Sequence, residues 1–458
     1  MTATVPNTGD AMPRPHRPLP LLLALLAALT LLPLAGPATA TAAAAPPDTP
    51  VGRQLTWLLD ASHRLPLTER EIGAHLTPAL LDAVGGAPGF NDLLADAAGD
   101  DGLRLDSYRS QQAPRDGVEA YALATGGPGR SHLVLVTDAS GALAALTLTP
   151  LPESWAELDE RLRAVAPDVS FLAARVDPAG ECHPVHALAP DTARPIGSAF
   201  KLYVLGALAE AVRAGSASWD EPLAVRDEWK APGGPVADLP AGTRLTLREY
   251  ADHMIFHSDN SATDHLMHRL GRDAVEAQQT RFGMADPAAN EPFLGTRELT
   301  QLKAVDYPRH ADAYVALDEA DRRAYLAEVL AGLPVPDAGW DEPRHVDSVE
   351  WFASPADLCR ALGGLSDQAA APGGQPVDDA LSLMGTRILG LDAEAWPVGW
   401  FKGGSEPGVM SRTFLAGAAT GETYVVSAMA SDPARDVTDA AGVAELLALS
   451  AGAFALVR

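Results

Sequence analysis

Three short groups of polar residues in the second half of the chain carry the residue types that acyl transfer needs. Ser198 is followed by Lys201, Ser258 by Asn260, and Lys402 by two glycines. A serine hydroxyl is a poor nucleophile until a neighbouring base removes its proton, and a lysine amine can act as that base. The pattern therefore predicts a serine nucleophile activated by a lysine, without a catalytic histidine.

The spacing of the first group places its two side chains together. Apolar residues recur with a helical period over 200–212, and Pro195 and Gly197 precede this segment as an entry turn. Residues three apart share one face of a helix, so the Lys201 amine is expected beside the Ser198 hydroxyl. The helix N-terminus would add partial positive charge where an oxyanion forms. The alternative interpretation is that Ser198 only caps the helix and Lys201 is solvated.

The second group follows a helix whose two ends are marked in the sequence. Thr246 and Glu249 have the spacing of a capping box, and the apolar residues after them indicate a helix that ends near His257. Ser258, Asp259 and Asn260 are then expected in the turn that follows. These three residue types are also common in ordinary polar turns, which is the competing interpretation.

The third group follows an apolar segment, 396–401, which is predicted to be a strand lining a cleft. Pro397 lies near the start of that strand, where a missing backbone donor is tolerated. Lys402 would attract a substrate carboxylate, and Gly403 and Gly404 would let a substrate backbone come close. The alternative is a simple glycine turn after an apolar strand.

The order of these motifs resembles the S-x-x-K, S-D-N and K-T-G set of class A β-lactamases and penicillin-binding proteins. The resemblance covers about residues 154–458 and implies an α/β sandwich, an antiparallel sheet with helices. It implies that Ser198 is the nucleophile, that Ser258 passes a proton to the leaving group, and that Asn260 orients lysine and substrate. The amides of Ser198 and Ser405 would form the oxyanion hole.

Two departures from the family pattern affect the chemistry that the resemblance implies. Gly403 replaces the threonine of the third motif, so a hydroxyl that could contact the substrate carboxylate is missing. The family carries its deacylating glutamate as E-P-x-x-N, and Glu291-Pro292 matches its start, but Gly295 stands in place of the asparagine. Glu291 is therefore a candidate deacylation base or simply a loop carboxylate. Without a working base, acylation would proceed while hydrolysis stalls.

Other segments are consistent with this fold. Strands joined by a turn are predicted at 169–175 and 183–188, and again at 413–417 and 423–430. A closing helix is predicted over 440–457.

Residues 51–150 are predicted to form a smaller α+β domain. Helical patterns come first and strands follow at 119–124, 132–137 and 142–149. This order resembles the cone-shaped fold of steroid isomerases and polyketide cyclases, and we expect the domain to shape or cover the neighbouring cleft. The whole arrangement also resembles two-domain β-lactamase-like proteins of clavam biosynthesis and their secreted actinobacterial relatives, which extends the substrate classes to esters.

The first fifty residues predict secretion. An apolar run over 19–34 follows basic residues, and small residues at 38–40 offer a cleavage site. We therefore expect a signal peptide over 1–40, a flexible linker over 41–50, and no membrane span in the secreted chain. The formal net charge of −26 argues against nucleic acid as a partner.

The cysteines and histidines give no metal or cofactor site. Cys182 and Cys359 are the only cysteines and could pair in an oxidising compartment, although the sequence does not fix their geometry. His253 and His257 are four apart on one predicted helix, but Met254 stands where a zinc protease would have glutamate. We expect these histidines to lie on the surface or in packing contacts.

Together these patterns predict a secreted serine hydrolase that forms an acyl-enzyme at Ser198 with a small molecule, either a β-lactam or a carboxylate-bearing ester. A D-Ala-D-Ala carboxypeptidase is one alternative. A catalytically weak β-lactam or cell-wall binding protein is another. The sequence does not choose between them and leaves the oligomeric state open.

Overall fold

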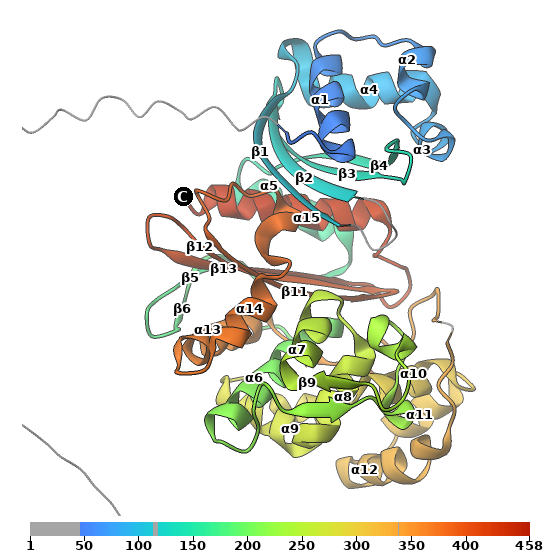
Figure 1. The fold of residues 1–458 in the computed structure, drawn as a ribbon, viewed down its shortest axis with the longest axis vertical. Coiled ribbons are helices and arrows are strands. Elements are labelled where there is room, and N and C mark those ends of the chain that lie inside the picture. Colours follow the sequence, from blue (N-terminus) through green and yellow to red (C-terminus); the bar gives the residue numbers. More distant parts are fainter. Residues whose placement is uncertain (1–45, 113–117, 338) are drawn as a thin grey trace, which may run out of the picture. The chain divides into compact units, whose positions relative to one another are not determined.

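The computed structural model describes residues 46–112, 118–337 and 339–458 (Figure 1). The predicted signal peptide and residues 41–45 of the predicted linker lie outside these ranges. Thr49 caps the first helix, which begins at Pro50, so the end of the predicted linker is already structured. Within the described ranges, none of the helices combines the length and the apolar character needed to cross a bilayer.

The larger sheet has five antiparallel strands in the order β11-β12-β13-β5-β6 (Figure 1). Both predicted strand pairs are confirmed, because β5 pairs with β6 and β12 pairs with β13. β11 is an edge strand, so no further strand pairs with its other side. The strands are β5 (Asp168–Val176), β6 (Cys182–Leu188), β11 (Val398–Glu406), β12 (Val409–Gly417) and β13 (Thr423–Ser431).

Helices cover both faces of this sheet, which confirms the predicted α/β sandwich (Figure 1). On one face lie α5 (Trp155–Val165) and α15 (Ala440–Leu456), the predicted closing helix. On the other face lie α6 (Lys201–Arg213) and α13 (Pro355–Ala370). α15 is apolar around most of its circumference and buried over much of its length, as expected of a helix inside a core.

A helical region beside α6 carries the second motif. Short strand pairs join its segments, β7 (Arg194–Pro195) with β10 (Phe352–Ala353) and β8 (Pro222–Ala224) with β9 (Arg244–Thr246). The helices are α7 (Leu247–Phe256), α8 (Asn260–Leu270), α9 (Arg272–Arg281), α10 (Thr296–Ala304), α11 (Arg309–Val315), α12 (Glu319–Glu328) and α14 (Gln375–Ser382).

The N-terminal region has helices first and then a four-stranded antiparallel sheet, as predicted. Its resemblance to steroid isomerases and the division of the chain near residue 150 both stay predictions. The strand β1 was not predicted, because its sequence mixes charged and apolar residues without clear alternation. The elements are α1 (Pro50–Ser62), α2 (Glu69–Gly73), α3 (Pro78–Ala83), α4 (Gly86–Ala98), β1 (Arg104–Gln112), β2 (Val118–Gly126), β3 (Gly129–Thr137) and β4 (Leu143–Pro150).

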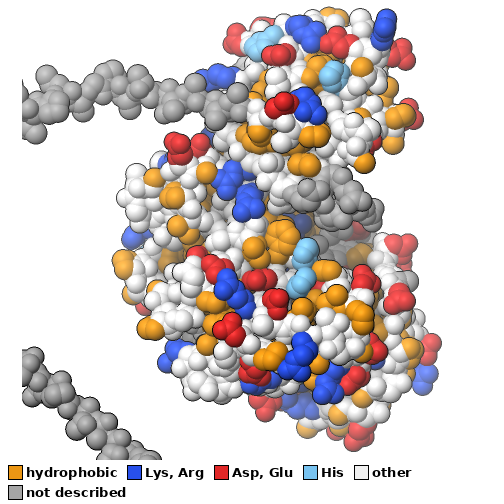
Figure 2. Space-filling view, in the orientation of Figure 1, with side chains coloured by type: hydrophobic (Ala, Val, Ile, Leu, Met, Phe, Trp, Pro, Cys, Tyr) orange, Lys and Arg blue, Asp and Glu red, His pale blue; other side chains and the backbone are white. Residues whose placement is uncertain are grey.

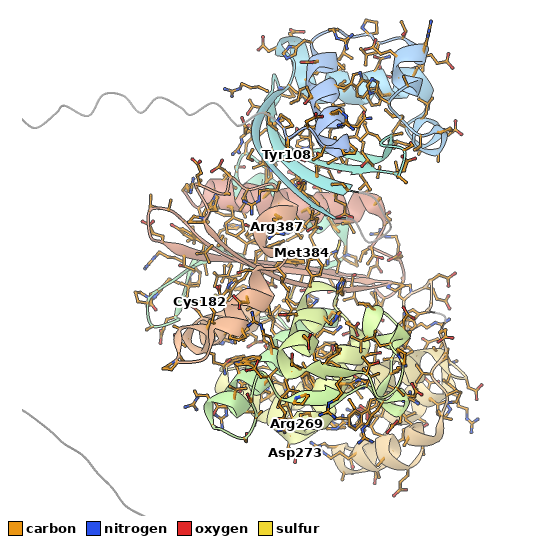
Figure 3. The ribbon with its side chains drawn as sticks, in the orientation of Figure 1. Tyr108, Cys182, Arg269, Asp273, Met384 and Arg387 are labelled. Carbon is orange, nitrogen blue, oxygen red and sulfur yellow. A yellow bond between two sulfur atoms is a disulfide. The ribbon has the colours of Figure 1, made fainter. Side chains whose placement is uncertain are left out.

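The N-terminal sheet contacts the segment that braces β11. Ser107 Oγ donates to the carbonyl of Gly390 at 2.5 Å, and His132 Nε2 lies 2.9 Å from the carbonyl of Ile388. These carbonyls belong to or follow the 3₁₀ helix η7 (Gly385–Leu389), where Arg387 is labelled in Figure 3. A Cβ on Gly385 would lie 2.6 Å from the carbonyl oxygen of Gly399 in β11, so η7 and β11 are in direct contact.

A disulfide joins Cys182, at the start of β6, to Cys359 in α13 (Figure 3). Their Cα atoms are 6.4 Å apart although 177 residues separate them in the sequence. The bond ties the outer edge of the sheet to the helix that covers it. The sequence did not decide whether these two cysteines pair, and the structure shows that they do.

Candidate active site

Ser198 lies at the start of the predicted helix, but in a tighter turn than expected. The 3₁₀ helix η2 (Gly197–Phe200) leads directly into α6, of which Lys201 is the first residue. Ser198 is half-buried, whereas Lys201 is fully buried. The Lys201 Nζ atom lies 3.2 Å from Ser198 Oγ, the contact that the spacing predicted.

The Lys201 amine is surrounded by oxygen atoms of the second motif. Its Nζ lies 2.7 Å from Asn260 Oδ1, 2.5 Å from the carbonyl oxygen of Ser258 and 3.3 Å from Ser258 Oγ. Burial lowers the pKa of Lys201 to about 7, against the opposing effect of the Asp259 and Asp264 carboxylates. A large fraction of the amine is therefore neutral near pH 7 and can accept a proton from Ser198.

Ser258 bridges two lysines. Its Oγ lies 2.9 Å from Lys402 Nζ and 3.3 Å from Lys201 Nζ. The capping box of Thr246 and Glu249 is confirmed, and α7 ends at Phe256, just before Ser258. Ser258 has a φ of 55°, in the left-handed region that non-glycine residues rarely adopt. This backbone conformation turns the chain sharply between α7 and α8, where Ser258 meets both amines.

Asp259 holds the second motif in place. Its carboxylate accepts hydrogen bonds from the backbone N–H groups of Ala262 and Val236, each at 2.7 Å, and so caps α8 and fixes a neighbouring loop. Asn260 is fixed at both ends, because its Nδ2 donates to the Pro232 carbonyl at 2.7 Å while its Oδ1 accepts from Lys201. The motif therefore orients the lysine.

Lys402 faces the same cleft from β11. Only 3% of the residue is exposed, and its Nζ contacts Ser258 Oγ and, at 2.7 Å, the Gly403 carbonyl oxygen. Burial and the positive charges of Lys201 and Arg412 lower its pKa. Among the described residues no carboxylate forms an ion pair with it, so its amine has only uncharged oxygen partners.

Arg412 is a site residue that the sequence reasoning missed. It lies on β12 directly opposite Gly403, and its Nη1 donates to the carbonyl oxygens of Ser411 at 3.1 Å and Gly404 at 3.3 Å. Burial lowers its pKa to about 10. A Cβ on Gly403 would lie 3.0 Å from Arg412 Nη1, so the glycine leaves room for the guanidinium. Pairing β11 with β12 in register would have revealed this neighbour.

The backbone around Ser198 and the end of β11 forms a closely packed pair of segments. A Cβ on Gly404 would lie 2.4 Å from the amide nitrogen of Ser198, and a Cβ on Gly197 would lie 2.9 Å from that of Ser405. The two amides that the resemblance assigns to an oxyanion hole therefore lie on touching stretches of chain. Glycine at 197 also permits the observed φ of 47°.

Glu291 does not join this cluster. The effects that raise its pKa are burial and the negative charges of Glu276 and Glu319, while Arg323 opposes them. Within the described ranges, no hydrogen bond links Glu291 to Ser198 or Lys201. That Glu291 activates the deacylating water therefore stays a prediction. α10 begins at Thr296, five residues after Glu291.

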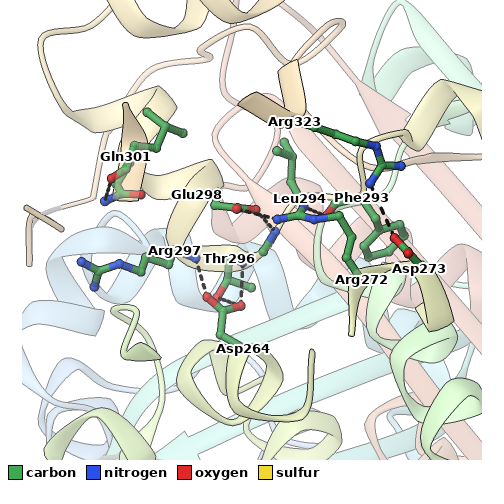
Figure 4. A network of polar contacts seen from close by, with 12 residues as sticks. Asp264, Arg272, Asp273, Phe293, Leu294, Thr296, Arg297, Glu298, Gln301 and Arg323 are labelled. Atoms are coloured by element: carbon green, nitrogen blue, oxygen red, sulfur yellow. Dashed lines mark hydrogen bonds and ion pairs between the residues drawn. The ribbon is translucent and has the colours of Figure 1, made fainter. Parts of the chain in front are cut away.

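A polar network joins α8 to the start of α10 (Figure 4). Asp264 accepts hydrogen bonds from the backbone of Thr296 at 2.7 Å and of Arg297 at 2.8 Å. The Thr296 hydroxyl also contacts the Asn260 carbonyl at 3.0 Å. A pocket of about 370 Å³ next to this network is lined by residues such as Asp264 and Arg297, but not by Ser198. It is therefore separate from the cluster around the nucleophile.

Comparison with known proteins identifies the central part of the chain. Residues 168–325 match the β-lactamase enzyme family. They include the nucleophile turn and the second motif. The antiparallel sheet with its helices is thus a β-lactamase-type fold, accompanied by an additional N-terminal α+β domain. A search of curated proteins gives no match.

Solved structures similar to this chain include β-lactamases and a penicillin-binding protein. A β-lactamase from Sphaerobacter thermophilus is 20% identical with a TM-score of 0.46, and covers 67% of this chain and 97% of its own. PBP-A is 18% identical with a TM-score of 0.45, and covers 67% of this chain and all of its own. A β-lactamase from Francisella tularensis is 13% identical with a TM-score of 0.46, covering 66% and 98%.

Proposed function

We propose that this protein is a secreted serine hydrolase that forms an acyl-enzyme through Ser198 with β-lactams or small carboxylate-bearing esters. The observation that carries the proposal is the 3.2 Å contact between Lys201 Nζ and Ser198 Oγ. Because burial brings the pKa of Lys201 to about 7, this amine can accept the serine proton at neutral pH.

In the proposed acylation, Lys201 takes the proton of Ser198 Oγ as that oxygen bonds to the substrate carbonyl carbon. The N–H groups of Ser198 and Ser405 stabilise the negative charge on the carbonyl oxygen. Lys201 then passes a proton to Ser258, whose own proton goes to the leaving nitrogen or oxygen as the bond to the carbonyl carbon breaks. The contacts of Ser258 Oγ with Lys201 and Lys402 support this relay.

Two cations favour a substrate with a carboxylate. Lys402 lies on β11, Arg412 lies on β12 opposite the neighbouring Gly403, and neither forms an ion pair in the described parts of the chain. A guanidinium can bind a carboxylate through two N–H groups, which partly replaces the hydroxyl lost with the family's threonine. Acidic and basic side chains are interspersed elsewhere on the face drawn in Figure 2.

A catalytically weak β-lactam-binding protein is the second candidate, and it is favoured because no hydrogen bond in the described ranges joins Glu291 to Ser198 or Lys201. The carboxylates that act on Lys201 are those of Asp259 and Asp264, and both accept backbone hydrogen bonds as caps. Neither is placed to activate a water at Ser198. Acylation would then outpace hydrolysis, and the covalent adduct would persist.

The secreted location is part of the proposal. The disulfide between Cys182 and Cys359 supports it, because such bonds persist in oxidising compartments.

Intact-protein mass spectrometry tests the proposal. Wild-type protein is incubated with a penicillin and a cephalosporin, beside Ser198→Ala and, as a matched control, Ser140→Ala in an exposed hairpin turn. We expect an adduct on wild type and Ser140→Ala only. A transient adduct indicates a hydrolase and a persistent one the binding protein. An adduct on Ser198→Ala, or none on wild type, would refute acylation at Ser198 by β-lactams.

A further inference from the structure

Three buried charged side chains meet behind the end of β11, outside the cluster described above. Lys303 of α10 donates to Glu406 Oε1, the last residue of β11. Glu350 neighbours Glu406, whose carboxyl helps to raise the pKa of Glu350 above its usual value. Lys303 is fully buried, Glu350 is 5% exposed and the Glu406 side chain is 10% exposed.

The charges of this cluster do not balance unless one carboxyl keeps a proton. Lys303 neutralises one carboxylate, and Glu406 Oε2 is buried without a hydrogen-bond donor. Glu350 Oε2 accepts a hydrogen bond from the Trp351 amide at 2.7 Å. Two ionised carboxylates cannot bond to each other, so a shared proton between Glu350 and Glu406 satisfies both groups.

The cluster connects to both sides of the expected oxyanion hole. Glu406 directly follows Ser405, whose amide is one of the two donors. Glu350 directly precedes Trp351, whose carbonyl accepts a hydrogen bond from the Ile196 amide at 2.9 Å. The Trp351 ring stacks on Phe200 with centroids 3.7 Å apart. Ile196 and Phe200 flank the turn that carries Ser198.

We propose that Lys303, Glu350 and Glu406 are positioning residues that hold the Ser405 end of β11 against the Ser198 turn, through one proton shared by the two carboxyls. Loss of that proton as the pH rises leaves two buried carboxylates facing one ammonium. Their repulsion loosens the end of β11 and separates the two amide donors. The role of these three residues in acylation rests on the function proposed above. The effect of the shared proton on the order of β11 does not depend on that function.

Few other groups beside Glu350 and Glu406 offset the charge of their two carboxyls. Burial raises the pKa of Glu350 well above its usual value, the negative charge of Glu406 adds to this effect, and Lys303 opposes it. On the segment before Glu350, Arg344 donates to the Lys303 carbonyl at 2.7 Å and pairs with the exposed Glu342 at 3.6 Å. The Trp340 ring lies 5.9 Å from Lys303 Nζ. Two of the contacts of Arg344 are thus with the Lys303 carbonyl and with Glu342, while its Nε is buried without a partner in the described parts of the chain.

The test compares wild type with Glu350→Gln, which keeps the shape and supplies a hydrogen-bond donor at every pH. Glu342→Gln, on the same segment but exposed, is the matched control. Hydrogen exchange of peptides covering 402–406 is followed by mass spectrometry from pH 6 to 9, corrected for intrinsic exchange and without any substrate. Above the pH at which the shared proton is lost, we expect the protection of these amides from exchange to fall about tenfold per pH unit in wild type and Glu342→Gln. In Glu350→Gln we expect the protection to stay level.

A second readout is the acylation rate by a penicillin over the same pH range. We expect the wild-type rate to fall at high pH and the Glu350→Gln rate to hold, with equal rates near pH 6. The same pH dependence of exchange in both proteins would overturn the inference. If no protein forms an adduct, the proposed function fails while hydrogen exchange still decides the inference. A neutral side chain at position 350 should stabilise the cluster, and the midpoint of thermal unfolding measures this. If Glu350→Gln does not fold, the inference is therefore overturned as well.

Discussion

Gly403→Thr restores the family's hydroxyl, yet we expect it to weaken carboxylate recognition in this protein. The new Cβ would lie 2.9 Å from Phe401 Cζ, 2.9 Å from the Ser411 carbonyl oxygen and 3.0 Å from Arg412 Nη1. The Ser411 oxygen is backbone and yields little, so the two side chains must move. Overpacking of this kind destabilises a protein by about 1–3 kcal/mol.

The larger effect is expected on substrate binding. In the described parts of the chain the guanidinium of Arg412 is held by two carbonyl oxygens, at 3.1 and 3.3 Å, so we expect a threonine side chain to displace it. A hydrogen bond to a charged group contributes about 1.5–3 kcal/mol, and its loss should lower the second-order acylation rate constant about 10- to 150-fold. A gain from the new hydroxyl offsets part of this loss.

The assay is the acylation rate of a chromogenic cephalosporin with wild type, Gly403→Thr, Arg412→Ala and the double variant. If the threonine acts by displacing Arg412, the double variant should be no slower than Arg412→Ala alone. Losses that add in the double variant would refute this reasoning, as would a Gly403→Thr protein that acylates faster than wild type.

Four further outcomes are expected. The acylation rate should rise through a midpoint near pH 7 as Lys201 loses its proton, and Lys201→Met should remove both the rise and most of the rate; a flat profile in wild type would exclude Lys201 as the base. Glu291→Gln should leave the decay of the adduct unchanged within about twofold, measured by mass spectrometry, and an adduct that persists longer would restore Glu291 as the base. Replacing both Cys182 and Cys359 by serine should lower the free energy of unfolding by about 2–4 kcal/mol in urea titrations, because the bond closes a long loop; an unchanged midpoint would contradict a role in stability. Burial lowers the pKa of His132 to about 4, so the unfolded chain binds a proton from about pH 6.5 downward that the folded protein refuses; stability should fall by about 3 kcal/mol between pH 6.5 and 4, and His132→Leu should flatten that slope in the same titrations.

The local spacing of residues was enough to predict the geometry of the first two motifs. Residues three apart in a helix share a face, so Ser198 and Lys201 meet whatever the rest of the chain does. The capping box at Thr246 likewise fixed where α7 begins, and the apolar period fixed where it ends. The strand pairs around 177–180 and 420–422 were predictable because short turns force neighbouring strands to pair.

Contacts between distant segments were decided only by the tertiary structure. The facing of Arg412 and Gly403 depends on the register of β11 and β12, and a shift of one residue would have turned the guanidinium to the other face. The role of Glu291 likewise depends on the path of the loop before α10, which no local pattern gives.

The buried cluster of Lys303, Glu350 and Glu406 brings together residues from three separate segments. In the sequence each of them is one charged residue among many, because charge patterns along the chain do not reveal burial. The same holds for the pairing of Cys182 with Cys359. The sequence determined the reacting groups and their immediate geometry, since these depend on helix and turn periods. The fold decided their electrostatic surroundings, since those depend on which distant side chains share one buried volume.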